Sequence, residues 1–388
     1  MSKRSTNPFV SYLSPLHSTT DMLRIEDPQG SRPTGAPAPR PGHKAALLPY
    51  MESLELYRQN AKKTNDPIVQ WEFTKYLIET AESIDIGAMT DASTSHLLGL
   101  SPNASTAMPS RDNAILMKEA LLAEGVKWLK KLTSGTGVGR GGLPDAQFLL
   151  AECYGAGRWG VGVDHDKAFG LYVQASKQSH RDATYRAAVC YEMGAGTKKD
   201  ASRAVQFYRK AASLSEPASM FRLAMILLEG SMGVGKNERE GITWLKRAAA
   251  VADAQHPEAL HELAACFERS DLPSIIPDET YAWELYIKAA QLGYAPSQYK
   301  LGHCFEYGVL RRETDAKRSI AWYSKAAEQG EPEAELALSG WYLTGADHIL
   351  PQSDTEAYAW ARKAADKELA KAEYAIGYYS EGTFPFVS

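Results

Sequence analysis

Residues 322–330 read WYSKAAEQG, and the Lys-Ala-Ala within this stretch returns along the chain with Lys or Arg in first place. The first alanine of each copy stands at positions 211, 248, 289, 326 and 364, so successive copies are 37, 41, 37 and 38 residues apart. A fixed period of this length is typical of helical repeat arrays, in which each unit buries its apolar face on its neighbours. Such an array more often offers a surface for partners than a pocket for chemistry.

Each repeat is predicted to contain two helices. The first carries a small residue, an apolar residue four positions later, a second small residue at five and a large residue at eight. These offsets place all four side chains on one helical face. In the repeat that begins near residue 144 they are Ala146, Leu150, Ala151 and Tyr154.

The second helix of each repeat has two recurring positions of its own. A small residue stands seven positions before the repeated alanine, and a bulky residue stands four before it. We expect the small residues to let the helices approach and the bulky ones to fill the core, so that added volume at a small position is costly. The small residues are Ala204, Gly241, Ala282, Ser319 and Ala357, and the bulky residues are Phe207, Trp244, Leu285, Trp322 and Trp360.

Composition and charge narrow the class of protein. The chain has 388 residues, 44% hydrophobic and 23% charged, with a net charge of −4. This balance is ordinary for a globular protein and predicts neither nucleic-acid binding nor attraction to an anionic membrane. No apolar run resembles a transmembrane helix or a signal peptide, so we expect a cytoplasmic protein without membrane insertion.

Four cysteines occupy one equivalent position in four repeats, because each directly precedes an aromatic residue. They are Cys153, Cys190, Cys266 and Cys304. Equivalent positions in neighbouring helical repeats lie roughly 10 Å apart, which is too far for a disulfide. We expect small buried side chains, with a metal or redox site as the alternative.

The chain divides into four predicted parts. Residues 1–48 are rich in Pro, Ser and Gly and are expected to be a disordered leader. Residues 49–143 hold N-terminal helices and a first divergent repeat, with a long insertion at about 85–110. Residues 144–382 hold tandem repeats and residues 383–388 a tail. The repeats start near residues 144, 181, 217, 257, 295, 332 and 370, and the last is incomplete.

Two short motifs resemble catalytic signatures without their context. Residues 137–142 spell G-x-G-x-x-G, but this nucleotide-binding fingerprint needs a preceding strand, and a helix is predicted there. His261-Glu262 begins H-E-x-x-H, but Ala265 replaces the second histidine, so we expect an exposed or capping histidine and no zinc pair. The sequence predicts no enzyme, no catalytic residue, no metal and no cofactor.

The phrase at 322–330 resembles the signature of the Sel-one-like repeat, a two-helix relative of the tetratricopeptide repeat. The resemblance extends from Pro144 to about Gly382. It implies an all-α fold, a right-handed α-solenoid superhelix of tandem two-helix repeats, with the first helices lining the concave side.

Three further stretches are similar to fungal chitin synthase activators, also called chitin synthase regulatory factors. They are YRQNAKKTNDPIVQWEFTKYLIE from Tyr57, AEGVKWLKKL from Ala123 and LPDAQFLLAECYGAG from Leu143. The resemblance implies a non-catalytic adaptor that binds the cytosolic part of a chitin synthase and regulates or localises it for septum and cell-wall chitin synthesis. Such a protein would be cytoplasmic and peripheral to the plasma membrane at septa or growth sites. The alternative is a general scaffold in signalling or protein quality control.

Two departures from that family affect the expectations. Some members end in a prenylation box, whereas residues 385–388 read PFVS and contain no cysteine, so no lipid anchor is expected. The last repeat lacks its second helix, and an exposed core there would favour a homodimer.

The candidate partner-binding residues stand three positions after the first small residue of the first-helix pattern, which is the fourth position of the motif. They are Arg186, Arg222, Glu262 and Lys300. We expect this position to face away from the inter-helix core. Three of its four side chains are basic, which suits an acidic segment of a partner, and a solvated charged face is the alternative. Charge reversal at Arg186 and Arg222 together is then expected to weaken partner capture with little loss of helicity.

Overall fold

The computed structural model describes residues 50–84, 111–134 and 141–381 of the chain. These residues form α-helices joined by turns, and within those ranges the only β-type pairing is an isolated bridge between Ala346 and Leu350. The predicted leader at 1–48, the insertion at about 85–110 and the tail at 383–388 lie outside the described residues. The predicted all-α class is confirmed for the described part, and the handedness of the superhelix stays a prediction.

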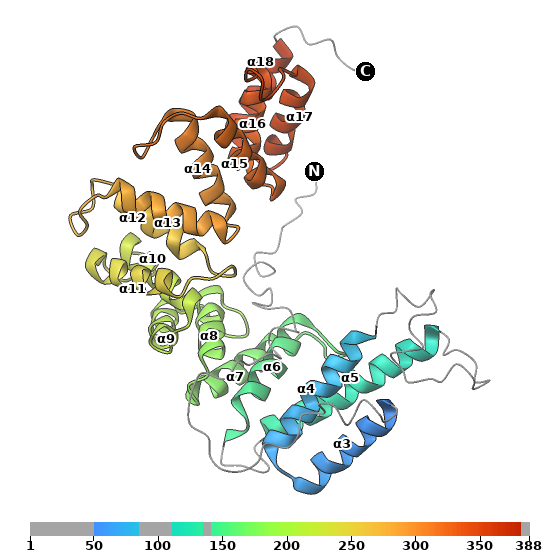
Figure 1. The fold of residues 1–388 in the computed structure, drawn as a ribbon. Coiled ribbons are helices and arrows are strands. Elements are labelled where there is room, and N and C mark those ends of the chain that lie inside the picture. Colours follow the sequence, from blue (N-terminus) through green and yellow to red (C-terminus); the bar gives the residue numbers. More distant parts are fainter. Residues whose placement is uncertain (1–49, 85–110, 135–140, 382–388) are drawn as a thin grey trace. The chain divides into compact units, whose positions relative to one another are not determined.

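The described helices belong to two compact units that divide after Leu214 (Figure 1). The first unit contains α3 (Tyr50–Thr64), α4 (Pro67–Ser83), α5 (Arg111–Thr133), α6 (Pro144–Ala156), α7 (His165–Lys177), α8 (Arg181–Met193) and α9 (Ala201–Ser213). The second unit contains α10 (Pro217–Glu229), α11 (Glu238–Ala250), α12 (Glu258–Glu268), α13 (Glu279–Gln291), α14 (Ala295–Tyr307), α15 (Ala316–Glu328), α16 (Pro332–Thr344), α17 (Asp354–Ala365) and α18 (Ala370–Glu381).

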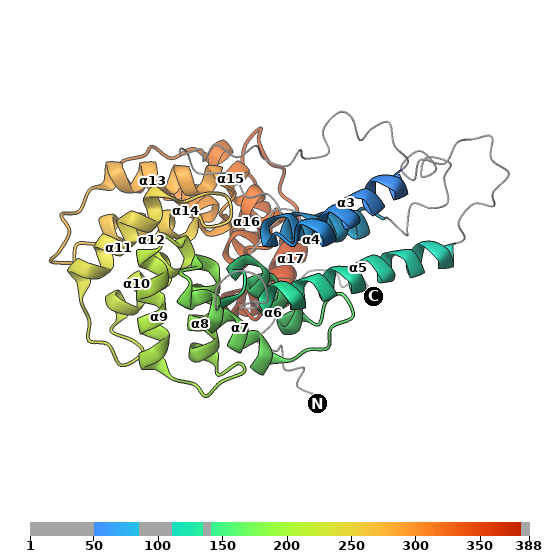
Figure 2. The same cartoon turned by 90° about the horizontal axis from the view of Figure 1, so that it is seen from below.

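The N-terminal helices pack around an aromatic core. Helices α4 and α5 lie side by side, as both views show (Figure 2). Phe73 of α4 is fully buried, and its ring meets that of Trp128 of α5 edge to face with the ring centres 5.8 Å apart. Helix α4 starts at Pro67, and the Asp66 side chain accepts the backbone N–H of Ile68 at 2.9 Å, which caps an otherwise unpaired donor.

Each repeat is a pair of helices, and its second helix begins at a polar cap. The first helices are α6, α8, α10, α12, α14 and α16, and each packs on the helix that follows it. A side chain just before each second helix accepts a backbone N–H of the first turn, which fixes where that helix starts. The capping residues are Asp164, Asp200, Asn237, Asp278, Asp315 and Ser353.

The small positions of the second helices are buried as predicted. The predicted bulky position, in contrast, lies one residue before the position that is fully buried. All five predicted small residues are buried. Of the five predicted bulky residues only Leu285 is buried, and Phe207, Trp244, Trp322 and Trp360 are partly exposed. The fully buried position is three before the repeated alanine, and its residues are Tyr208, Leu245, Tyr286, Tyr323 and Ala361.

This error has a simple geometric cause. Successive residues of an α-helix are rotated by about 100°, so a shift of one position moves a side chain from the core to its edge. The tryptophans at the edge lie beneath cations instead. Arg247, Lys325 and Lys363 lie over Trp244, Trp322 and Trp360, with cation-to-centroid distances of 4.8, 4.5 and 3.6 Å.

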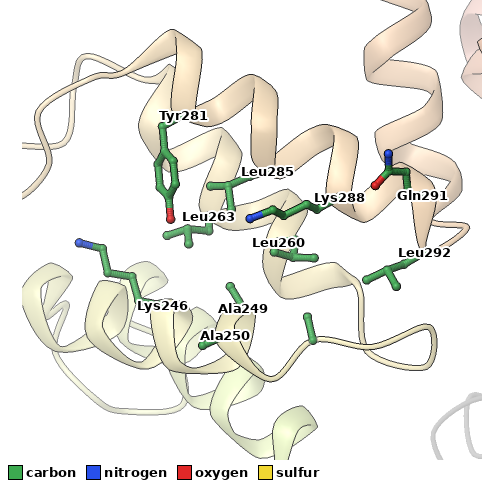
Figure 3. Close-up of a pocket in the computed structure, with 11 residues that line it drawn as sticks. Lys246, Ala249, Ala250, Leu260, Leu263, Tyr281, Leu285, Lys288, Gln291 and Leu292 are labelled. Atoms are coloured by element: carbon green, nitrogen blue, oxygen red, sulfur yellow. The ribbon is translucent and has the colours of Figure 1, made fainter.

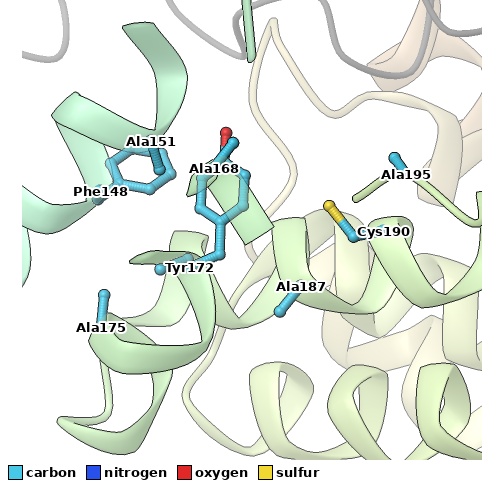
Figure 4. Packing of buried hydrophobic residues seen from close by; sticks show 9 residues of the cluster. Phe148, Ala151, Ala168, Tyr172, Ala175, Ala187, Cys190 and Ala195 are labelled. Carbon is cyan, nitrogen blue, oxygen red and sulfur yellow. The ribbon is translucent and has the colours of Figure 1, made fainter. Parts of the chain in front are cut away.

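The four cysteines are free and buried, as predicted from their equivalent positions. Figure 4 shows Cys190 of α8 within a cluster that also includes Tyr172 of α7 and Phe148 and Ala151 of α6. Burial raises the pKa of Cys190 to about 12 and that of Cys266 to about 11. These thiols are protonated at neutral pH, as packed side chains rather than nucleophiles would be.

Candidate protein-binding surfaces

The four predicted partner-binding residues fall on four first helices. Arg186 lies on α8 in the first unit, whereas Arg222, Glu262 and Lys300 lie on α10, α12 and α14 in the second. Arg186 is fully buried, and the other three are partly exposed. The prediction that this position faces away from the packed core is therefore wrong for Arg186.

Arg186 lies buried against a carboxylate from the preceding first helix. Its Nε lies 3.1 Å from Oε1 of Glu152 on α6, and the Tyr172 hydroxyl donates to the same oxygen at 2.6 Å. Burial, reinforced by the Glu152 charge, raises the pKa of Tyr172 well above its ordinary value, so its hydroxyl remains a donor. The three side chains join α6, α7 and α8 into one polar cluster inside the apolar core.

Lys300 makes the same kind of link in the second unit. Its Nζ lies 2.7 Å from Oε1 of Glu268 on α12, and the Tyr286 hydroxyl of α13 donates to Oε2 of that carboxylate at 2.9 Å. The Lys300 side chain is 23% exposed, so the pair is screened more strongly than the pair made by Arg186. At both sites a cation on one first helix binds a carboxylate on the preceding first helix.

Glu262 has a different environment from the cations at its repeat position. Burial first, and then the charge of Glu229 on α10, raise the pKa of its carboxyl group. The four residues therefore do not form one exposed row. Two of them hold consecutive repeats together, a role that the pattern within a single repeat does not reveal.

A groove in the second unit is a better candidate for a binding surface (Figure 3). It lies between the second helices α11 and α13, with α12 beneath, and its volume is about 570 Å³. Leu260 and Leu263 of α12 line it between the two walls. Lys246 rises from the α11 wall and Lys288 from the α13 wall. The remaining lining residues are Ala249, Ala250, Ala252, Tyr281, Leu285, Gln291 and Leu292.

The groove opens where the repeat spacing is longest. Tight connections between repeats use a residue with positive φ in the turn, such as Gly293 (φ 94°) after α13 and Gly330 (φ 83°) after α15. Residues 251–257, between α11 and α12, are a longer turn with no positive-φ residue. This turn accounts for the spacing of 41 residues at that point. The long step was visible in the sequence, but its consequence for the groove was missed.

The structure describes the predicted His261-Glu262 motif fully and the glycine-rich motif at 137–142 only in part. His261 is packed rather than exposed, since its ring meets the rings of Tyr286 and Tyr294 and its Nδ1 lies 2.8 Å from Ser297 Oγ. Burial, with the nearby Lys300 charge, lowers its pKa to about 4. Helix α5 precedes the glycine-rich stretch, as predicted, while residues 135–140 lie outside the described part.

No group of three or more His, Cys, Asp or Glu side chains is placed to hold a metal ion among the residues that the structure describes. Within the same ranges, none of the helices combines the length and the apolar content needed to cross a membrane.

Comparison with known proteins gives fungal relatives over most of the chain. The chain is 35% identical to the chitin synthase regulator SKT5 of Saccharomyces cerevisiae, across 87% of this chain and 46% of that protein. It is 44% identical to chitin synthase regulatory factor 3 of Schizosaccharomyces pombe, across 62% of this chain and 26% of that protein. The chain thus spans less than half the length of either of these relatives.

A solved structure and a family model agree on the repeat type. The crystal structure of a Sel1 repeat protein from Oxalobacter formigenes matches with a TM-score of 0.54 and 26% identity, over 64% of this chain and 98% of that one. The Sel1 repeat model matches residues 144–180, 181–216, 217–252, 257–294, 295–331 and 332–369. It leaves residues 253–256 unmatched, within the long turn beside the groove. These six matches include more than half of the residues, and the chain therefore belongs to the Sel1 repeat family.

Proposed function

We propose that this chain is a non-catalytic adaptor that binds a fungal chitin synthase and regulates or localises it. The observation that carries the proposal is the similarity, across most of the chain, to fungal proteins named chitin synthase regulators. A repeat array suits this role because stacked helical hairpins present an extended surface, along which a partner contacts several repeats.

The chemistry of the described side chains supports a role without catalysis. Burial raises the pKa of the Cys266 and Cys304 thiols to about 11, which leaves them protonated at neutral pH. The His261 imidazole is neutral there and packed between tyrosine rings. A general base or nucleophile needs the opposite, a reactive form that substrate can reach.

The proposed place of action is the cytosolic face of the plasma membrane, at septa or growth sites, through the cytosolic part of the synthase. Of the four side chains at the fourth position, Arg222, Glu262 and Lys300 remain proposed partner contacts because each is partly exposed. Arg186 is not a proposed partner contact, because its guanidinium is buried against Glu152.

Affinity purification of the tagged chain from fungal cells, followed by mass spectrometry, tests the proposed function. We expect a chitin synthase to be recovered with the chain and to be absent from a tag-only control. Recovery of chaperone or ubiquitin components alone would instead support a general quality-control scaffold. Substrate turnover by the purified chain would contradict the non-catalytic role.

We also propose that the chain self-associates through its last described helix. Helix α18 exposes Tyr374 and Tyr378 (79% and 65%), one helical turn apart, while Tyr379 is buried and its hydroxyl lies 2.8 Å from Ser339 Oγ. Light scattering is expected to show a molar mass that rises with concentration. The double variant Tyr374→Ser/Tyr378→Ser is expected to keep the mass of one chain. A wild-type mass that stays at one chain over the whole range would refute self-association.

A further inference from the structure

We propose that the groove between α11 and α13 binds a protein segment that carries aliphatic side chains flanked by acidic ones. The inference rests on the proposed function for the identity of the partner, and adds the site and the chemistry of the segment. It concerns the side of the repeats formed by second helices, rather than the first-helix positions that the sequence pattern favours.

The base of the groove is formed by leucine side chains, of which Leu260, Leu263 and Leu285 are themselves largely buried. Leu260 and Leu263 of α12 lie between the walls, and Leu285 and Leu292 border them from α13 and the turn after it. Ala249 and Ala250 form the facing wall on α11, where small side chains leave room for an occupant. A volume of about 570 Å³ is in the range of small ligand sites, so it accepts a few side chains of a segment rather than a whole domain.

The charged lining has one sign only. Lys246 and Lys288 line opposite walls, and no Asp or Glu belongs to the lining among the residues described. The Lys246 ammonium lies 5.6 Å from the centre of the Phe267 ring, a contact that leaves it able to bind an anion. Two ammonium groups beside an aliphatic base favour carboxylates on either side of an apolar side chain.

An equivalent lysine in the first unit makes a bond that Lys288 does not make within the described residues. Lys210 precedes the repeated alanines of α9 as Lys288 does in α13. In the first unit, Lys210 Nζ donates to the backbone carbonyl of Ser176 near the end of α7, the preceding second helix. Across the groove no such bond joins Lys288 to α11 in the described structure. The Lys288 side chain is exposed and lines the groove from the α13 wall.

A peptide-binding measurement on the full chain tests this inference directly. The probes are fluorescently labelled short synthetic peptides with a Leu-Leu centre and glutamates at varied distances on both sides, each with a matched peptide that has glutamine instead. We expect at least one glutamate peptide to bind with an affinity about tenfold higher than its glutamine partner, and the difference to shrink with added salt. Equal binding of every matched pair, or no binding at all, would overturn the proposal.

Charge reversal assigns the binding to this groove. The variant Lys246→Glu/Lys288→Glu is expected to lose about tenfold in affinity for the glutamate peptide. The control Lys177→Glu/Lys317→Glu makes the same change in net charge at exposed lysines outside the groove and is expected to bind as the wild type does. Because all four side chains are exposed, circular dichroism is expected to show that both variants fold. Equal affinities of the two variants would place the binding elsewhere and overturn the proposal.

The same variants separate this inference from the proposed function. If the wild-type chain and the groove variant capture chitin synthase equally from fungal membranes, the groove is not the docking site, although the adaptor role stands. If only the groove variant loses capture, both are supported. If the wild-type chain captures no synthase, the adaptor role fails, and the peptide measurement still decides the chemistry of the groove.

Discussion

Replacing Arg186 with leucine is expected to lower the free energy of unfolding of the first unit by about 3–5 kcal/mol. The substitution leaves the buried Glu152 carboxylate without the cation that lies 3.1 Å from it. Denaturant unfolding followed by circular dichroism measures the loss. Hydrogen exchange of the α6–α8 amides assigns it to the first unit, which matters because two units need not unfold together.

Lys300 provides a matched control for Arg186, because it occupies the same repeat position and is partly exposed. The substitution Lys300→Leu is expected to cost about 1 kcal/mol or less. The double variant Arg186→Leu/Glu152→Leu is expected to recover much of the stability lost in Arg186→Leu, since it removes both charges. If Arg186→Leu cost no more than Lys300→Leu, the buried link between α6 and α8 would be wrong.

The burial of Arg186 changes what charge reversal at this residue would report. The sequence pattern favours charge reversal at Arg186 and Arg222 as a probe of a partner surface. Because Arg186 is buried against Glu152, reversing it places two carboxylates together in the core. Lost capture by that variant would then report unfolding of the first unit rather than a binding surface.

Removing the Tyr323 ring is expected to be far more damaging than removing the larger ring beside it. Tyr323 is 1% exposed, and a Cβ built on Gly302 would lie 2.6 Å from its ring carbon Cδ1. The substitution Tyr323→Ala therefore opens a cavity and is expected to cost about 3–5 kcal/mol. Trp322→Ala removes a partly exposed side chain and is expected to cost about 1 kcal/mol. Thermal and denaturant unfolding of both variants measure the difference.

Tyr323→Phe separates packing from hydrogen bonding at this position. It keeps the ring and removes only the bond that the hydroxyl donates to Glu306 Oε2 at 2.6 Å, so we expect a loss of about 1 kcal/mol. If Trp322→Ala destabilised the second unit as much as Tyr323→Ala, the core would be centred on the tryptophan position, as the sequence pattern alone indicates.

The fold could be predicted from the sequence because the same residue pattern recurs in each repeat. The period of the Lys-Ala-Ala copies and the pattern of small and apolar residues in the first helices are local signals. Leu223 and Leu301 hold the apolar position of that pattern, and both are buried as the pattern requires. The exact core face of the second helices was harder. Tyrosine and tryptophan both satisfy an apolar pattern, and only packing shows that Tyr323 lies inside while Trp322 lies beneath Lys325.

The candidate sites could be predicted less well, because they depend on pairs from different repeats. Arg186 looks exposed within its own helix, and its partner Glu152 stands 34 residues earlier on another helix. The groove likewise requires two second helices and the turn between repeats. Its sequence signal was one long step in a regular series, and a spacing alone does not show which side chains line the resulting gap.

Titration of the purified chain against the purified cytosolic part of a chitin synthase tests the adaptor role most directly. Calorimetry is expected to show saturable binding with one site per chain and a dissociation constant below about 10 µM. The Lys246→Glu/Lys288→Glu variant is expected to bind more weakly under the same conditions. No saturable binding up to about 1 mM would contradict the adaptor role.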